Sequence, residues 1–454
     1  MLPPVMLDTT TLDAPVAAAA VPREPGAEAA PLPRWSLPTR LAFRFCVLYF
    51  GLFVVSTQML GGLLPFSWVR SLDSTAMMRG LITWTGMRVF HLPTAPSFEG
   101  TGSGDTMADY LQVFCLLMAA GATTAVWSAL DSRRANYRAL HKWFVVFLRV
   151  AVGSTMVTYG MVKAIPLQMP APGLQRLLEP FGNFSPMGVL WYSIGASKSY
   201  EMFAGFMELT AGVLLFVPQL AMVGALTTFG DTVQIFTLNM TYDVPVKLFA
   251  FHLLLMSVVL IAPEARRLAN VLVFNRTAAP STQLPLFRRR TAVLVMVAAQ
   301  LAYGGYIVWT NYARARQAWA QYGGGAPRSP LYGVWNIERM VIDGQERAAL
   351  ISDYGRWRRV FFQSPASMTF QLMDETFLPF QAKVDTAAGT IAVAAGSNGP
   401  ASALTFHRPD AEHLILEGML QGRQLRMETR RFDPAKFPLL NRGFNWIQER
   451  PFNR

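Results

Sequence analysis

Cysteine, histidine and charged side chains are all scarce in this chain of 454 residues. The two cysteines, Cys46 and Cys115, lie inside apolar runs and form no CxxC pair. This excludes a disulfide framework and disfavours a thiol-redox or cysteine-rich metal site, so we expect both to act as small apolar side chains. The five histidines show no metal-ligand spacing, and no metal site is predicted.

The scarcity of charge indicates a membrane protein. Asp, Glu, Lys and Arg make up 15% of the chain and apolar residues 52%, whereas about a quarter of an average soluble protein is charged. The net charge of +12 does not indicate nucleic-acid binding, because most basic residues outside the C-terminal third cluster in short segments between apolar runs. That pattern orients membrane proteins. We therefore expect membrane lipids as partners and no nucleic acid.

Changes in composition divide the chain into four parts. Residues 1–35 are rich in Ala and Pro and lack the apolar core of a cleavable signal peptide, so a disordered N-terminal tail is predicted. Residues 36–311 contain the long apolar runs of a transmembrane helical domain. A glycine- and proline-rich hinge is predicted at 312–330, followed by a β domain at 331–454.

Seven apolar runs approach the roughly 20 residues that a helix needs to cross a bilayer. The segment 74–92 also has helical spacing of apolar residues, but it contains Arg79 and Arg88, which favours an interfacial or re-entrant helix over a span. The sequence thus predicts a membrane α-helical bundle of about seven transmembrane helices, at 42–64, 110–130, 143–164, 202–217, 219–240, 248–263 and 291–310.

The positions of Lys and Arg predict the orientation of this bundle. If the N-terminus is cytoplasmic, the connections on that side carry thirteen basic residues, and those on the opposite side carry six. Basic residues are enriched in cytoplasmic connections. We therefore expect a cytoplasmic N-terminus and an extracytoplasmic C-terminal domain.

The C-terminal part has the alternation and turn signals of a small β-barrel. Eight candidate strands lie at 332–342, 357–363, 367–373, 378–385, 389–394, 402–408, 413–419 and 422–431. Eight short antiparallel strands suit a closed barrel. The opening Gly333-Val-Trp335 resembles the lipocalin-like arrangement, in which an arginine of the last strand covers the tryptophan; Arg430 or Arg431 would do so here. If Trp335, Phe361, Phe370 and Phe406 filled the barrel lumen, this would count against the hypothesis that the barrel carries a ligand.

Charged and polar residues gather near one end of the predicted bundle. In the expected orientation, Lys163, Glu208 and His252 all fall in its outer half, and we assign them as candidate catalytic residues, with His252 or Glu208 exchanging protons. Asp231 lies near mid-membrane. The alternative is that Glu208–Lys163 and Asp243–Lys247 are ion pairs that only fix helix packing. Candidate ligand-binding residues come from the stretch 239–252, namely Asn239, Tyr242, Asp243 and Lys247.

The first outer connection contains Gly102-Ser-Gly-Asp-Thr106. Its backbone amides could bind an anion, but it follows no strand and lacks a phosphate-loop lysine. A turn that caps the next helix, with Asp105 or Thr106 as N-cap, is the favoured interpretation.

Residues 143–275 resemble the DoxX-like membrane proteins, compact bundles of about four helices. The resemblance rests on Tyr159-Gly-Met-Val-Lys163, on Phe203-Ala-Gly-Phe-Met-Glu208 with the following Gly212, and on the stretch 239–252. The wider layout, with GSGDT, a lipocalin-like tail and Asn441-Arg-Gly-Phe-Asn-Trp446, is also similar to bacterial DoxX-family proteins. The resemblance implies the bacterial inner (plasma) membrane, with the β domain periplasmic, and an association with membrane redox complexes.

Three functions follow from these observations. The first is a quinone-linked or redox-complex-associated membrane component with a polar site at the outer mouth of the bundle. A bound quinone or a partner subunit would then supply the redox chemistry, because no haem-ligand pair, flavin fingerprint or thiol pair is present. The second is non-enzymatic transfer of a lipid or small apolar ligand through the barrel. The third is a structural scaffold for a membrane complex.

Overall fold

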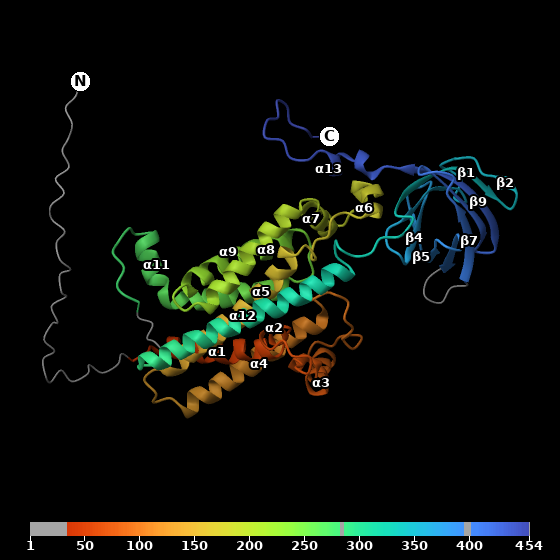
Figure 1. The fold of residues 1–454 in the computed structure, drawn as a ribbon. Helices are drawn as coiled ribbons and strands as arrows, with labels where there is room; N and C mark the ends of the chain where they lie inside the picture. The colour runs from red at the N-terminus through yellow and green to blue at the C-terminus, as the bar shows by residue number, and fades with distance from the viewer. Residues whose placement is uncertain (1–33, 282–285, 395–400, 454) are drawn as a thin grey trace, which may run out of the picture.

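A computed structural model describes residues 34–281, 286–394 and 401–453. It contains a helical domain and a C-terminal β-barrel that lies beyond one end of the helices (Figure 1). Residues 1–33 of the predicted N-terminal tail lie outside the described residues.

Long helices occupy all seven of the predicted apolar runs. Among the described residues, five segments are long and apolar enough to cross a membrane: Leu37–Val55 (α1), Met107–Leu130 (α4), Arg138–Ala164 (α5), Lys247–Leu272 and Arg290–Gln321 (α12). The fourth of these consists of α10 (Lys247–Ile261), a 3-10 turn (Ala262–Glu264) and α11 (Ala265–Leu272). The remaining two runs form α8 (Lys198–Phe216) and α9 (Ala221–Thr241).

Short helices fill the connections. They are α2 (Met59–Leu63), α3 (Ala76–Trp84) with a π-helical turn (Thr85–Val89), α6 (Leu174–Leu178), α7 (Pro186–Gly195) and α13 (Pro438–Asn441). Three more 3-10 turns lie at Leu72–Ser74, Phe181–Asn183 and Pro434–Lys436. The helix predicted within 74–92 is thus present as α3, and it packs against α4.

Two predicted boundaries differ from the structure. The first run, 42–64, is divided, because α1 ends at Val55 and α2 begins at Met59. Helix α12 continues to Gln321, so residues 312–321 of the predicted hinge are helical. Alanine is frequent in that segment and favours the helix; the chain leaves it only at the glycines that begin with Gly323.

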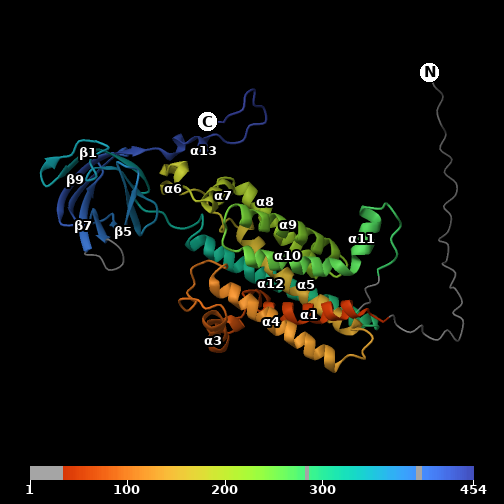
Figure 2. The same ribbon diagram turned by 180° about the vertical axis from the view of Figure 1, so that it is seen from behind.

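Glycines bring α5 and α8 into backbone contact. A Cβ on Gly205 would lie 2.2 Å from the Ala164 nitrogen, and one on Gly160 would lie 2.5 Å from the Leu209 nitrogen. About two helical turns away, Gly212 meets Gly153 in the same way, because a Cβ on Gly212 would lie 2.8 Å from the Gly153 carbonyl oxygen. Small residues allow such close approach in membrane bundles. Figures 1 and 2 show α5 and α12 running between an α8–α9 side and an α1–α4 side.

The C-terminal domain is the predicted closed antiparallel barrel of eight strands. A short extra strand, β2 (Gln345–Glu346), extends β1 outside the closed ring. Neighbouring strands pair in chain order, and β1 pairs with β9 to close the barrel. The strands of the ring are β1 (Gly333–Ile342), β3 (Trp357–Phe362), β4 (Ser367–Leu372), β5 (Phe377–Asp385), β6 (Thr390–Ala394), β7 (Ala401–His407), β8 (His413–Leu420) and β9 (Arg423–Phe432).

Side chains fill the barrel interior. Trp335 and Phe370 are fully buried in its core, and Phe406 packs against that core. Phe361 points the other way and joins a separate cluster with Leu174. The cation over the Trp335 ring is Arg408, at 5.5 Å, and not the predicted Arg430 or Arg431. On the paired strand β9, Arg431 is the register partner of Trp335 and Arg430 is that of Asn336. Both are neighbours of Trp335 in the sheet, but the guanidinium over its ring belongs to Arg408.

The connection between α5 and α7 attaches the barrel to the helical domain. Leu174 of α6 packs on Val334 and Phe361 at the outside of the barrel. Its backbone nitrogen also donates to Gln363 Oε1 at 3.0 Å. We call the end of the bundle that carries α6 and the end of α5 the barrel end, and the end that carries α11 the distal end (Figures 1 and 2).

Hydrogen bonds of the buried Arg44 connect α1 to the α4–α5 connection at the distal end. Arg44 is 1% exposed. Its guanidinium donates to the Tyr137 hydroxyl at 2.6 Å and to the Asp131 carbonyl at 2.8 Å. The Tyr137 hydroxyl in turn donates to the Asp131 carboxylate at 2.7 Å, and this hydrogen bond lowers the pKa of Asp131. The network fixes the start of α5 and hence the helix that carries Lys163.

Candidate functional site

The close packing of α5 and α8 brings Lys163 and Glu208 together. Lys163 lies one turn beyond Gly160, and Glu208 lies one turn beyond Gly205. Their side chains form an ion pair, and both residues are buried. The second carboxylate oxygen of Glu208 is also buried, yet it has no hydrogen-bond partner among the described residues. The structure thus brings two of the three predicted catalytic residues into direct contact.

Two further carboxylates share this region. Glu201, on α8 and 1% exposed, accepts the Met169 backbone N–H at 2.9 Å. Asp231 of α9 lies within electrostatic range of both Glu208 and Lys163, and Glu201 lies within range of Lys163. One oxygen of Glu201 and one of Asp231 are buried without a partner among the described residues. We call Lys163, Glu201, Glu208 and Asp231 the barrel-end cluster.

Sequence reasoning missed Glu201. The signal was its spacing, because Glu201 precedes Glu208 by two helical turns and therefore lies on the same face of α8. Asp231 was predicted to lie near mid-membrane, but no partner could be assigned to it from sequence. In the structure α9 packs on α8, and this packing brings Asp231 within electrostatic range of Glu208.

The barrel-end cluster contains three carboxylates and one ammonium group, which pairs directly with Glu208 alone among the described residues. An isolated carboxylate is costly to bury without a partner, and binding a proton removes most of that cost. A proton that one of these groups releases can be taken up by a neighbour or passed to a bound molecule. The arrangement is therefore chemically suited to hold and exchange protons.

His252, the third predicted catalytic residue, has separate partners. Its Nε2 lies 2.6 Å from the Tyr49 hydroxyl, and its Nδ1 lies 2.6 Å from the Leu248 carbonyl oxygen. The ring also stacks on Phe53 with centroids 4.0 Å apart. Because a carbonyl only accepts, Nδ1 carries a proton, and Nε2 accepts from Tyr49 in the neutral ring. Within the described residues, no hydrogen bond or ion pair joins His252 to Lys163 or Glu208.

The predicted ligand-binding stretch 239–252 is held by the GSGDT loop. Asp105 accepts the backbone N–H groups of Lys247 and Leu248, both at 2.9 Å, and so caps the start of α10. Lys247 pairs with Asp243 at 2.9 Å. Asn239 donates to the Val246 carbonyl at 3.3 Å. The remaining candidate of this stretch, Tyr242, is the C-cap residue of α9.

The loop therefore caps two helices. Thr106 is the N-cap of α4, as predicted, and forms a capping box with Asp109. Asp105, the other predicted N-cap, serves α10 instead. The neighbouring Gly104 N–H donates to the Pro245 carbonyl at 2.8 Å. The loop thus joins the start of α4 to the α9–α10 turn. Of the charged side chains there, Lys247 pairs with both Asp105 and Asp243.

Replacing Asp105 with alanine should lower the free energy of unfolding by about 1–2 kcal/mol, because two helix-start N–H groups and Lys247 lose their acceptor. Thermal unfolding in detergent micelles measures the effect. Asp243→Asn is the matched control: it removes the charge of the other partner of Lys247, and asparagine tolerates the positive φ of 51° at this position. Because the Asp243 side chain is 83% exposed, the change should cost less than about 0.5 kcal/mol. Equal effects of the two changes would show that Asp105 does not cap α10.

Comparisons with known proteins do not assign a function to this site. No family model matches the chain. It is 24% identical over 143 residues to "Uncharacterized protein YwoB" of Bacillus subtilis (strain 168), a match that covers 30% of this chain and 85% of that protein. No solved structure matches significantly.

Proposed function

We propose that the chain is a DoxX-type integral membrane protein that serves as a quinone-linked or redox-complex-associated component. In this proposal α8 and α9 also cross the membrane, which gives seven spans. The N-terminus is cytoplasmic and the barrel lies in the periplasm of a bacterial inner membrane. The barrel-end cluster then lies in the outer half of the bundle, as the distribution of Lys and Arg predicts.

One observation carries the proposal: Glu201, Glu208 and Asp231 each have a buried carboxylate oxygen without a partner among the described residues, and one ammonium group, that of Lys163, pairs with Glu208. Intramembrane ionisable groups are costly and usually serve transport, proton relay or ligand binding. Quinone reduction to quinol takes up two electrons and two protons at the two ring oxygens. The barrel-end cluster would supply protons, and a partner redox subunit would supply the electrons.

The other two functions have less support. Transfer of a ligand through the barrel requires an open lumen, whereas Trp335, Met340, Met368 and Phe370 fill the interior. A scaffold without a site gives no reason for the unpartnered carboxylate oxygens of Glu201, Glu208 and Asp231. A scaffold is nevertheless the function that a negative result in the following experiment would favour.

The proposal is tested by measuring quinone binding to the full chain in lipid nanodiscs, with a short-chain benzoquinone as the probe. We expect saturable binding that weakens about tenfold in Glu208→Gln, a loss of ~1.4 kcal/mol. Glu417→Gln, on the exposed surface of the barrel, is the control and should bind as the wild type does. Extraction of native-lipid preparations should also yield quinone. Absence of quinone from the extract, together with equal affinity in all three proteins, would contradict the proposal.

A further inference from the structure

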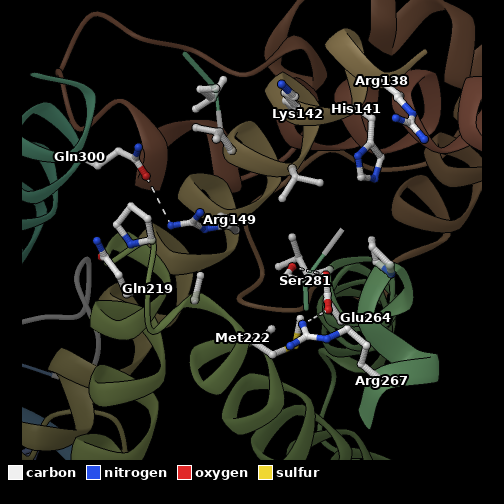
Figure 3. A pocket seen from close by; sticks show the side chains of 18 of the residues that line it. Arg138, His141, Lys142, Arg149, Gln219, Met222, Glu264, Arg267, Ser281 and Gln300 are labelled. Carbon is white, nitrogen blue, oxygen red and sulfur yellow. Dashed lines mark hydrogen bonds and ion pairs between the residues drawn. The ribbon is translucent and has the colours of Figure 1, made fainter. Parts of the chain in front are cut away.

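A large cavity opens at the distal end, away from the barrel-end cluster. It has a volume of about 880 Å³ and lies between α5, the α8–α9 turn, α10 with α11, and the first half of α12 (Figure 3). A volume of this size accommodates a drug-sized molecule or part of a lipid.

Most of the cavity wall is apolar. Each of the surrounding helices contributes aliphatic side chains, and Phe287 contributes an aromatic ring from the segment before α12. The aliphatic residues include Val145 of α5, Met222 of α9, Val271 of α11 and Val293 of α12. Such a wall favours an occupant with a hydrocarbon portion over a small, fully hydrated anion.

Basic side chains line the same cavity. Arg138, Lys142, Arg149 and Arg267 contribute four cationic groups, and Glu264 contributes one carboxylate. That carboxylate is already neutralised by Arg267 and accepts a hydrogen bond from Ser281 at 2.7 Å. The cavity therefore has a positive excess, and Figure 3 shows the labelled basic side chains arranged around one open space.

The basic groups have different attachments within the protein. Arg149 donates to the Leu215 carbonyl at 2.8 Å and reaches Gln300 at 3.4 Å, which fixes it between α8 and α12. Arg267 also donates to the Ala279 carbonyl at 2.7 Å. The half-buried Arg138 side chain, in contrast, makes no hydrogen bond or ion pair with the described residues. Arg138 is thus available to bind an external anion.

We propose that this cavity binds an anionic phospholipid. The phosphodiester headgroup is held by Arg138 and the neighbouring basic groups, and an acyl chain lies along the aliphatic wall. Basic pockets between membrane helices bind lipid headgroups in this way, and the apolar wall distinguishes a lipid from free phosphate. The site is separate from the barrel-end cluster and does not depend on a redox function.

The test compares lipids on the purified, delipidated full chain. Phosphatidylglycerol, added in mixed micelles, should raise the thermal unfolding midpoint more than phosphatidylcholine does at equal concentration. In Arg138→Ala the apparent affinity for phosphatidylglycerol should fall roughly fivefold, the effect of one basic residue at an anionic lipid. The matched control is Arg133→Ala, which replaces an exposed arginine of the connection just before α5, outside the cavity lining; this variant should bind phosphatidylglycerol as the wild type does.

Three outcomes would overturn the proposal. Equal stabilisation by the two lipids would remove the role of the negative charge. The same stabilisation by inorganic phosphate alone would indicate a free-anion site and not a lipid site. An equal loss of affinity in Arg138→Ala and Arg133→Ala would indicate general surface attraction. Unfolding midpoints measured without added lipid show whether Arg138→Ala folds as the wild type does, and native mass spectrometry measures lipid binding to the folded fraction directly.

Discussion

Replacing Gly205 with alanine should destabilise the helical domain by at least about 3 kcal/mol. The added Cβ would lie 2.2 Å from the Ala164 nitrogen and 2.8 Å from the Gly160 carbonyl oxygen. These are backbone atoms of α5, so no side chain can rotate away to make room. The helices must separate, and Lys163 then loses its contact with Glu208. The loss should appear as a large drop in the thermal unfolding midpoint and a smaller monodisperse fraction after detergent extraction.

Gly121→Ala is the control for this prediction. Gly121 lies within α4, and a Cβ there meets no atom within 4 Å. Alanine is the better helix former, so this change should be neutral or should stabilise the protein by about 0.4–1 kcal/mol. If Gly205→Ala were as well tolerated as Gly121→Ala, α5 and α8 would not be in backbone contact, and the position of the barrel-end cluster would be wrong.

Replacing Lys163 with methionine should cost about 3–5 kcal/mol, because it leaves the buried Glu208 carboxylate without its counter-ion. The double variant Lys163→Met with Glu208→Met should recover most of this loss, since two apolar side chains of similar length replace a buried ion pair. Thermal unfolding of the wild type, both single variants and the double variant in the same detergent provides the double-mutant cycle.

The sign and size of the coupling decide this second prediction. A buried pair requires that the double variant be more stable than the sum of the two single losses predicts, by at least about 3 kcal/mol, because the double variant recovers most of the loss in Lys163→Met. Additive losses would show that Lys163 and Glu208 do not interact in the folded protein. A small loss in Lys163→Met, together with additivity, would mean that water solvates Glu208.

Local pattern predicted the barrel well because strand alternation and turn residues act over short distances. All eight strands of the ring formed close to the predicted bounds, with turns such as Gln421-Gly422 between β8 and β9. The helices were similarly predictable from their apolar runs. Polar residues lower the mean hydropathy of α8 and α9, so these two helices are not among the five described segments that qualify as spans by length and composition. The count of seven spans is therefore still a prediction.

The candidate site was less predictable because depth along a helix does not specify which face a side chain occupies. His252 was placed at the same level as Lys163, but its hydroxyl partner, Tyr49, comes from α1, far away in sequence. Asp105 likewise caps α10 across a tertiary contact with no local signature. The Lys163–Glu208 contact was foreseeable as an ion pair, whereas its glycine-lined approach became evident only in three dimensions.

The central claim, that the barrel-end cluster exchanges protons with a quinone, is tested most directly by infrared difference spectroscopy in lipid nanodiscs. Reduction of the added benzoquinone should change a protonated-carboxyl band that shifts in heavy water. The change should be absent or altered in Glu208→Gln and Asp231→Asn and retained in Glu417→Gln. A wild-type protein without any carboxyl change on quinone reduction, or one whose change persists alike in Glu208→Gln, Asp231→Asn and Glu201→Gln, would contradict the claim.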